Sequence, residues 1–300
     1  MTLRSRLQRL PLLGYFGLSY GISWGGILVV LSFTGFDLVW LRPLDTGLIF
    51  IVMLLGPSAA GLAMTTLLDG RRGLRELVSS MARWRVSRRW YGVALLTMPL
   101  LLFATLWLLS TFVDPAFAPG FRWPLFAIGL VAGTFEEVGW TGFATPCLLA
   151  RQHPLIAGLS LGLAWALWHA LVDFRQNFNT HGVLWLLEFA LLYTAALTAY
   201  RLLMTYLYAH TQSLLLAVLM HASYTGWLFV LYPSTSFRPG FVWQGTFAAM
   251  LCVAVAVINA GRSGAGPRLE GSVGLRSKRP LAADEAALRP LRPAEQARMD

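Results

Sequence analysis

The chain is predicted to be an all-α, polytopic membrane protein, a bundle of about eight transmembrane helices. Two features of its composition predict this fold class: 56% of its 300 residues are hydrophobic and only 13% are charged. Soluble domains carry about 25% charged residues. The third observation is that the apolar residues form evenly spread runs, most of them close to the ~20 residues that cross a bilayer as a helix. The even spread favours one membrane domain over two.

Eight apolar runs are long enough to be spans. The first, Leu12–Phe33, exceeds the length of a signal-peptide core, and no small-residue cleavage motif follows it, so we interpret it as a membrane helix. The other seven are Gly47–Leu67, Trp90–Val113, Pro124–Ala150, Leu155–Val172, Val183–Tyr208, Ser213–Leu231 and Phe241–Ala260. Residues 1–260 are therefore the predicted membrane domain. Residues 261–300 are rich in Gly, Ala, Pro, Arg and Glu, and are predicted to form a disordered basic cytoplasmic tail.

The basic residues between the spans predict the orientation. The N-terminal segment, the second and fourth loops and the tail together carry 19 Arg or Lys, whereas the alternate loops carry 4. Because cytoplasmic loops hold the excess of positive charge, both termini are predicted to be cytoplasmic, which requires an even number of spans. Lys278 is the only lysine, and arginine richness without lysine suggests a GC-rich bacterial genome. We therefore expect an integral protein of the bacterial plasma membrane.

Composition also excludes several classes of function. The net charge of +10 is accounted for by loops between spans, so no nucleic-acid partner is predicted. Both cysteines, Cys147 and Cys252, fall inside apolar runs, which excludes a disulfide framework and a cysteine-based metal motif. The segment Met81–Trp90 mixes arginine with tryptophan and is interpreted as an interfacial belt. A dedicated lipid or substrate site is the alternative for that segment.

Two adjacent carboxylates are the most informative feature of the chain. Glu136 and Glu137 lie inside the apolar run Pro124–Ala150, although a carboxylate at bilayer depth costs roughly 2.5 kcal/mol or more. Two other spans each carry one histidine near the middle, His169 and His221. Acids and imidazoles at membrane depth are the components of a buried catalytic or ion site.

Helical geometry tests whether these groups can meet. Glu136 lies about 18 Å from the outer end of its span, and His221 lies about 12 Å from the inner end of another. In a ~30 Å core these positions are at the same level, and His169 lies about 9 Å nearer the outer surface. Glu137 and Thr141 are four residues apart and share one face of their helix.

The chemistry that these residues offer is hydrolysis. A carboxylate beside an imidazole can hold and deprotonate a water molecule, and a second histidine can donate a hydrogen bond to a developing oxyanion. Alternatively, Glu136, His169 and His221 could bind Zn²⁺ as two imidazoles and a carboxylate. The spacing does not separate these two mechanisms. Two further charges inside a span, Glu188 and Arg201, are expected to reach toward the membrane interfaces instead of the site.

The motifs resemble those of a known family. The stretch EEVGWTGFATPCLL, then WALWH, then SLLLAVLMHASYTG is similar to the CPBP family of intramembrane proteases. This family includes CAAX prenyl endopeptidases and bacteriocin-processing or self-immunity relatives. Its pattern is EExxxR, then FxxxH, then HxxxN or HxxxD, and the resemblance covers roughly residues 50–230.

The resemblance implies roles for individual residues. Glu136 corresponds to the water-activating glutamate, with Glu137 beside it, and His169 corresponds to its partner. His221 corresponds to the histidine that stabilises the oxyanion, and Thr225 occupies the position of the Asn or Asp that follows it.

Three positions depart from the pattern. Thr141 replaces the arginine, Trp165 replaces the usual phenylalanine and Thr225 replaces Asn or Asp. Without the arginine, Glu137 is expected to lack a cation that would hold it ionised. A threonine at 225 keeps a donor but has a shorter reach.

The resemblance thus implies intramembrane peptide-bond hydrolysis by a water activated by glutamate and histidine, with or without Zn²⁺. The expected partners are the lipid bilayer and a membrane-associated peptide or protein substrate. Two alternative functions remain open. One is a proton- or ion-coupled transporter that uses the same acids and imidazoles as a relay. The other is a catalytically impaired family member that acts as a membrane immunity or scaffold partner.

Overall fold

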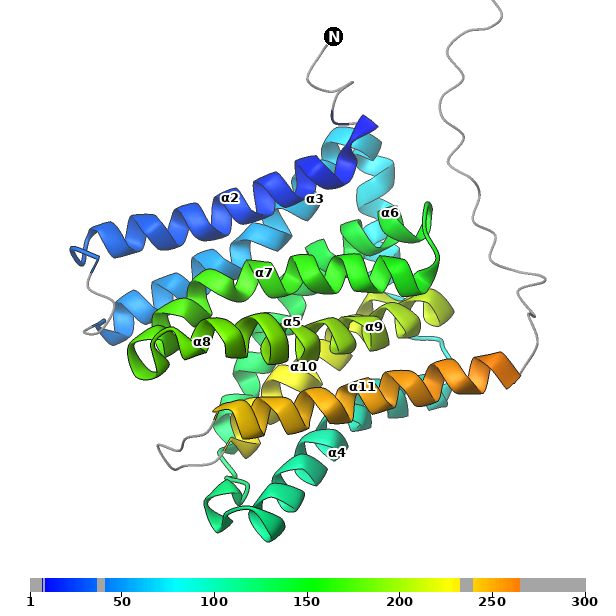
Figure 1. Ribbon diagram of the computed structural model, residues 1–300. Helices are drawn as coiled ribbons and strands as arrows, with labels where there is room; N and C mark the ends of the chain where they lie inside the picture. The colour runs from blue at the N-terminus through cyan, green and yellow to red at the C-terminus, as the bar shows by residue number, and fades with distance from the viewer. Residues whose placement is uncertain (1–6, 8, 37–40, 233–239, 265–300) are drawn as a thin grey trace, which may run out of the picture. The chain divides into compact units, whose positions relative to one another are not determined.

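The computed structural model describes residues 7, 9–36, 41–232 and 240–264, apart from the side chains of 174–181, 240 and 261–264. Within these ranges the chain folds into helices and contains no β-strand (Figure 1). The predicted all-α class is therefore confirmed. Of the predicted tail, only residues 261–264 are described, and they continue the last helix.

The helices follow one another with short connections. The long α-helices are α2 (Pro11–Ser32), α3 (Pro43–Met81), α4 (Arg88–Phe112), α7 (Pro154–His181), α9 (Thr194–Thr211), α10 (Leu214–Leu231) and α11 (Gly240–Gly264). The shorter elements are η1 (Pro115–Phe117), η2 (Trp123–Leu125), α5 (Phe126–Gly139), η3 (Trp140–Ala144), α6 (Thr145–Leu149), α8 (Leu184–Leu187) and η4 (Glu188–Tyr193). Both η3 and η4 are π-helical turns, whereas η1 and η2 are single 3₁₀ turns.

Seven helical stretches within the described residues are long and apolar enough to cross a membrane. They correspond to seven of the eight predicted spans. The remaining span, Pro124–Ala150, is helical from Phe126 to Leu149 but is divided into α5, η3 and α6. The π turn therefore interrupts the regular helix in the run that carries both glutamates.

The helix α3 continues beyond its predicted span. Gly70 has φ 57° and ψ −144°, a conformation that only glycine adopts without steric cost, and it kinks α3 at this point. The residues after the kink are helical as far as Met81, where a loop was expected. Their exposed arginines include Arg72, which pairs with Glu76 at 2.9 Å.

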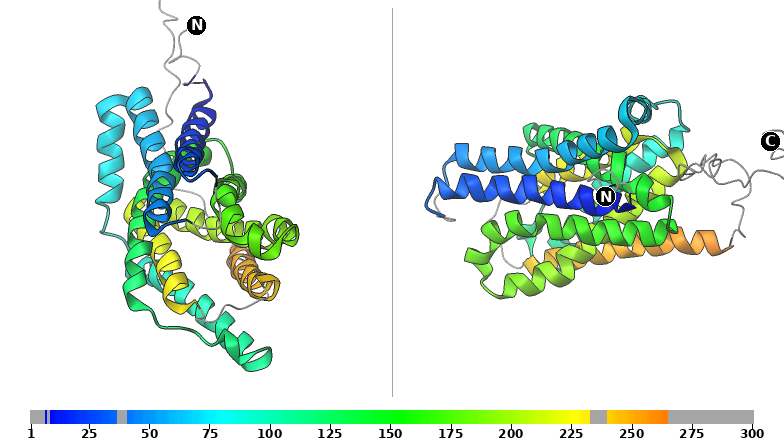
Figure 2. Two further views of the ribbon diagram at one scale, coloured as in Figure 1. Left: turned by 90° about the vertical axis from the view of Figure 1, so that its left-hand side faces the viewer. Right: turned by 90° about the horizontal axis from the view of Figure 1, so that it is seen from above.

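The most extensive helix pairings join α10 with α5, α2 with α3, and α7 with α9; α2 and α3 run side by side in both views (Figures 1 and 2). In its membrane segment, 67% of α10 is buried, compared with 22% of α2 and of α11. The helix that carries His221 is thus an inner helix of the bundle.

Small residues allow α5 to approach α10 closely. A Cβ on Gly129 would lie 2.3 Å from the backbone nitrogen of Gly226, and a Cβ on Gly133 would lie 2.8 Å from that of Ala222. Such distances are shorter than any real Cβ contact, so both positions require glycine at this helix separation. This close approach brings the end of α5, with its two glutamates, against His221.

Candidate active site

Four helices contribute to one buried polar cluster. Glu136 and Glu137 lie near the end of α5, directly before the π turn η3. His221 faces them from α10, Arg201 from α9 and Trp165 from α7. All five side chains are at most 6% exposed. Because π turns often mark functional sites, the position of η3 next to the glutamates is consistent with a site here.

Glu137 is the centre of the hydrogen-bond network. Its Oε2 accepts from Arg201 Nη1 at 2.9 Å, and its Oε1 accepts from Arg201 Nη2 at 3.0 Å. His221 Nδ1 lies 2.6 Å from Oε1, and the Thr141 hydroxyl donates to Oε2. The fork of the guanidinium matches both carboxylate oxygens, which is the strongest geometry for such a pair.

Two expectations about charge are therefore wrong. Arg201 does not extend to the membrane interface, because its side chain is 0% exposed and is bound to Glu137. Glu137 does not lack a cation, because α9 supplies the one that its own helix does not carry. Glu188, the other charge in that run, is also buried.

Glu136 is held by a different set of contacts. Its Oε2 accepts a hydrogen bond from Trp165 Nε1 at 2.8 Å. Its Oε1 lies 3.8 Å from His221 Nε2, which is too long for a direct hydrogen bond. A single water molecule can lie between the two atoms at that separation. One carboxylate oxygen is thus fixed while the other faces the imidazole.

His169 lies one turn after Trp165 on α7. Its Nδ1 is 3.0 Å from the Trp165 carbonyl oxygen, so Nδ1–H donates there and Nε2 keeps the lone pair in the neutral ring. The ring contacts the indoles of Trp165 and Trp168, with centroids 5.0 and 4.8 Å away. His169 is half-buried. It is therefore linked to Glu136 through Trp165, and it is more accessible than the other residues.

Thr225 lies one turn after His221 on α10 and is half-buried. Among the described residues it forms no hydrogen bond with the cluster. The structure thus brings together Glu136, Glu137 and His221, adds His169 through an indole, and leaves Thr225 at the edge.

The described residues give no support to the zinc site considered from the sequence. In the described part of the chain, no three His, Cys, Asp or Glu side chains are arranged to hold a metal ion. The pattern of the cluster is one of hydrogen bonds between ring nitrogens and carboxylates.

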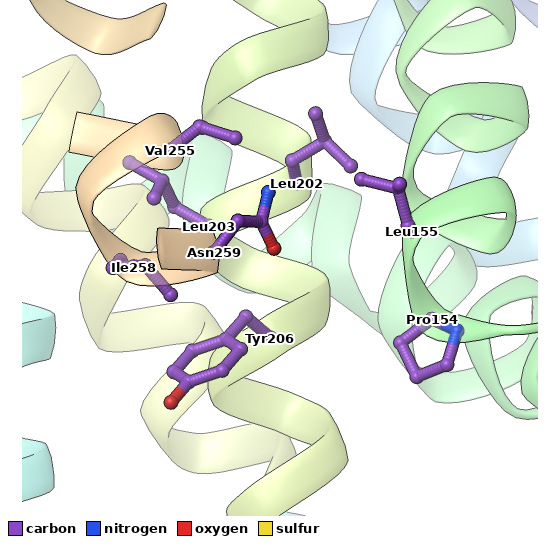
Figure 3. Close-up of a pocket in the computed structure, with 8 residues that line it drawn as sticks. All are labelled: Pro154, Leu155, Leu202, Leu203, Tyr206, Val255, Ile258 and Asn259. Atoms are coloured by element: carbon purple, nitrogen blue, oxygen red, sulfur yellow. The ribbon is translucent and has the colours of Figure 1, made fainter. Parts of the chain in front are cut away.

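A pocket elsewhere in the bundle does not include these residues. It lies among α7, α9 and α11 and is lined mostly by apolar side chains, with Tyr206 and Asn259 as the polar exceptions (Figure 3). Its lining contains none of the glutamates or histidines of the cluster.

Two residues of the cluster were missed as site residues from the sequence. Trp165 was identified only as a substitution in the second motif, and its indole N–H binds Glu136. Arg201 stands alone inside the run Val183–Tyr208. A buried charge within a span is by default a functional candidate, and that signal could have identified it.

Comparisons with known proteins agree with the motifs. Residues 118–227 match the family described as type II CAAX prenyl endopeptidase Rce1-like. This stretch contains every residue of the cluster. The chain is also 39% identical over 54 residues to CAAX prenyl protease 2 of Methanococcus maripaludis, a match that covers 18% of this chain and 20% of that protein. The resemblance to the CAAX-type intramembrane proteases predicted from the three motifs is therefore confirmed, and residues 118–227 are the part of the chain that carries it.

Proposed function

We propose that this protein is an intramembrane endopeptidase of the CAAX type, in which Glu136 activates the attacking water. One observation carries the proposal: Glu136 Oε1 faces His221 Nε2 at 3.8 Å inside the membrane domain. Glu136 Oε2 is held by Trp165, and His221 Nδ1 is held by Glu137. The two groups therefore present one free atom each to the same space, where a water molecule and a peptide carbonyl could be bound.

The proposed reaction uses these two atoms. Glu136 takes a proton from the water as its oxygen adds to the carbonyl carbon. The carbonyl oxygen becomes negative, and His221 in its doubly protonated form donates Nε2–H to it while Nδ1–H remains on Glu137. As the carbon–nitrogen bond breaks, the proton on Glu136 passes to the leaving nitrogen. The water oxygen and one of its hydrogens thus end on the new carboxyl group, and the other hydrogen ends on the new amine.

His169 and Thr225 have supporting roles in this proposal. The neutral ring of His169 donates Nδ1–H to the Trp165 carbonyl, so its Nε2 can accept a hydrogen bond from the water. The Thr225 hydroxyl, one turn from His221, would be a second donor to the oxyanion. The roles of both residues rest on the resemblance to the protease family, because neither forms a hydrogen bond with the glutamates.

The proposed substrate is a peptide bond in a membrane-anchored chain. The relative from Methanococcus maripaludis is named a CAAX prenyl protease, so a farnesylated peptide with a C-terminal Cys-a-a-X sequence is the first probe. A membrane peptide without a lipid is the second probe, because a bacterium supplies few prenylated proteins. We also infer a bacterial plasma-membrane location with cytoplasmic termini, as the distribution of arginine indicates.

The test is proteolysis by the purified protein in liposomes. Wild type should cleave at least one probe, and Glu136→Gln should lower the rate by about 1,000-fold or more, since it removes the general base. Glu76→Gln is the matched control, because Glu76 is exposed and pairs with Arg72 outside the buried cluster; it should retain the wild-type rate. Full activity in Glu136→Gln would show that the base is assigned wrongly.

The two other classes of function make different predictions in the same liposomes. A folded wild-type protein that cleaves neither probe would favour the non-catalytic membrane partner. Proton or ion flux that depends on Glu136, without cleavage, would favour the transporter.

A further inference from the structure

Arg201 contacts both of the side chains that hold the proposed catalytic pair, Glu136 and His221. Its guanidinium binds Glu137 with two hydrogen bonds, and Glu137 in turn holds His221 Nδ1. The same guanidinium lies over the Trp165 indole, with Cζ 4.4 Å from the ring centroid. The indole N–H holds Glu136. One buried cation therefore supports His221 through the Glu137 carboxylate and supports Glu136 through the Trp165 ring.

The two contacts constrain different degrees of freedom. The bidentate pair fixes the carboxylate plane of Glu137, which fixes the hydrogen bond from His221 Nδ1 and the orientation of the His221 ring. The cation–π contact fixes the face of Trp165, and so the direction of its N–H toward Glu136 Oε2. Both effects act on the 3.8 Å separation between Glu136 Oε1 and His221 Nε2. A lysine could supply the charge but neither the fork nor the planar stacking.

We propose that Arg201 is a positioning residue that sets the geometry between Glu136 and His221. The inference rests on the proposed hydrolysis, and it adds a residue from α9 that touches neither water nor substrate. Since Arg201 is 0% exposed and acts only through Glu137 and Trp165, its removal should lower kcat and leave KM nearly unchanged.

The chain offers a matched position to which the cation can be moved. The Thr141 hydroxyl donates to the same Glu137 oxygen, Oε2, as Arg201 Nη1. Position 141 is one helical turn from Glu137, so an arginine there can reach the carboxylate. In wild type, a second buried cation at 141 would be unpaired. Thr141→Arg alone should therefore lower activity.

Three variants test the proposal by rates of proteolysis in liposomes. Arg201→Met removes the cation and keeps an apolar stem, and it should lower kcat by about 100-fold, the typical effect of a small misplacement of reacting groups. Arg201→Lys should lower kcat by about tenfold, because a lysine keeps the charge and loses the fork. The double variant Arg201→Met with Thr141→Arg should regain at least about tenfold over Arg201→Met.

A second readout does not depend on activity. In ¹⁵N-histidine-labelled protein, the nitrogen shifts of His221 report which ring nitrogen carries the proton, and His221→Gln identifies its signals among the five histidines. Wild type should show Nδ1 protonated. Arg201→Met should change the Nδ1 shift, because the hydrogen bond from Nδ1–H to Glu137 is no longer held in place, and the double variant should restore the wild-type signal. If Arg201→Met does not fold, the shifts and kcat of Arg201→Lys and of the double variant decide the question.

Two results would overturn the proposal. The first is wild-type kcat and wild-type His221 shifts in Arg201→Lys and in Arg201→Met, with only the melting temperature lowered, which would make Arg201 purely structural. The second is a double variant that folds but is no more active than Arg201→Met. Failure of the proposed function is distinguishable from both, because then wild type cleaves neither probe while the nitrogen shifts still report the effect of Arg201 on His221.

Discussion

Single side chains decide what this site can do. Glu136, Glu137, His169 and His221 could be singled out from the sequence, because ionisable groups inside apolar runs are costly and rare. The partner of Glu137 could not, because Glu137 and Arg201 are 64 positions apart and no periodicity in the sequence pairs α5 with α9. The substitution of Thr141 for arginine suggested a missing cation. The structure supplies that cation from another helix.

The Trp165 indole provides a test at the level of one hydrogen bond. Trp165→Phe keeps most of the ring that packs against His169, His221 and Arg201 and removes only the N–H that binds Glu136. A hydrogen bond to a charged group contributes about 1.5–3 kcal/mol, so we expect kcat to fall about 10- to 100-fold. The measurement is steady-state proteolysis in liposomes. A variant with unchanged kcat would show that the indole does not orient the base.

Metal dependence is a second prediction at this scale. Because no group of His, Cys, Asp or Glu side chains in the described part of the chain is arranged to hold a metal ion, dialysis against 1,10-phenanthroline should leave the rate of proteolysis unchanged. The control is a zinc protease treated in the same way, which should lose activity. Loss of activity that is restored by added Zn²⁺ would instead assign Glu136, His169 and His221 as zinc ligands, the role considered from their residue types.

At the scale of helices, the spans could be predicted because apolar length determines them, but their internal irregularities could not. The run Pro124–Ala150 gives no sequence signal for the π turn at Trp140–Ala144, which depends on packing. Nor did the apolar pattern show that α3 continues past Gly70 to Met81. The closeness of α5 and α10, however, follows from small residues facing one another, with Gly129 and Gly133 opposite Ala222 and Gly226.

A substitution at Gly133 should therefore lower the stability of the fold and disturb the geometry of the site. Gly133→Val places methyl groups where a Cβ alone would lie 2.8 Å from the Ala222 backbone, so α5 must move away from α10. We expect a melting temperature lower by several degrees, as for other overpacked cores, and a loss of activity as Glu136 separates from His221. Gly17→Val is the control, because a Cβ at Gly17 meets no atom within 4 Å. Equal melting temperatures and activities for the two variants would contradict this account of the helix contact.

At the scale of the whole molecule, the all-α class and seven of the eight spans were predictable from apolar runs. Orientation rests on charge alone: 19 Arg or Lys on one set of segments against 4 on the other. Most of the predicted tail, residues 261–300, lies outside the described residues, so its disorder stays a prediction.

The orientation has its own test. Reporter fusions after Arg89 and after Ala260 should both report the cytoplasm, because both positions lie next to basic segments, which remain in the cytoplasm. A fusion after Arg122, in a loop predicted to be external, should report the opposite side and serves as the control. Opposite locations for Arg89 and Ala260 would refute an even number of spans.

The central claim is that Glu136 and His221 act as one hydrolytic unit, and a double-mutant cycle tests it most directly. Rates of proteolysis in liposomes would be measured for wild type, Glu136→Gln, His221→Gln and the double variant. Groups that act as a unit are strongly non-additive, so we expect each single change to remove nearly all activity and the double variant to be no slower than either. Wild-type rates in either single variant, or independent partial losses that multiply in the double variant, would contradict the account.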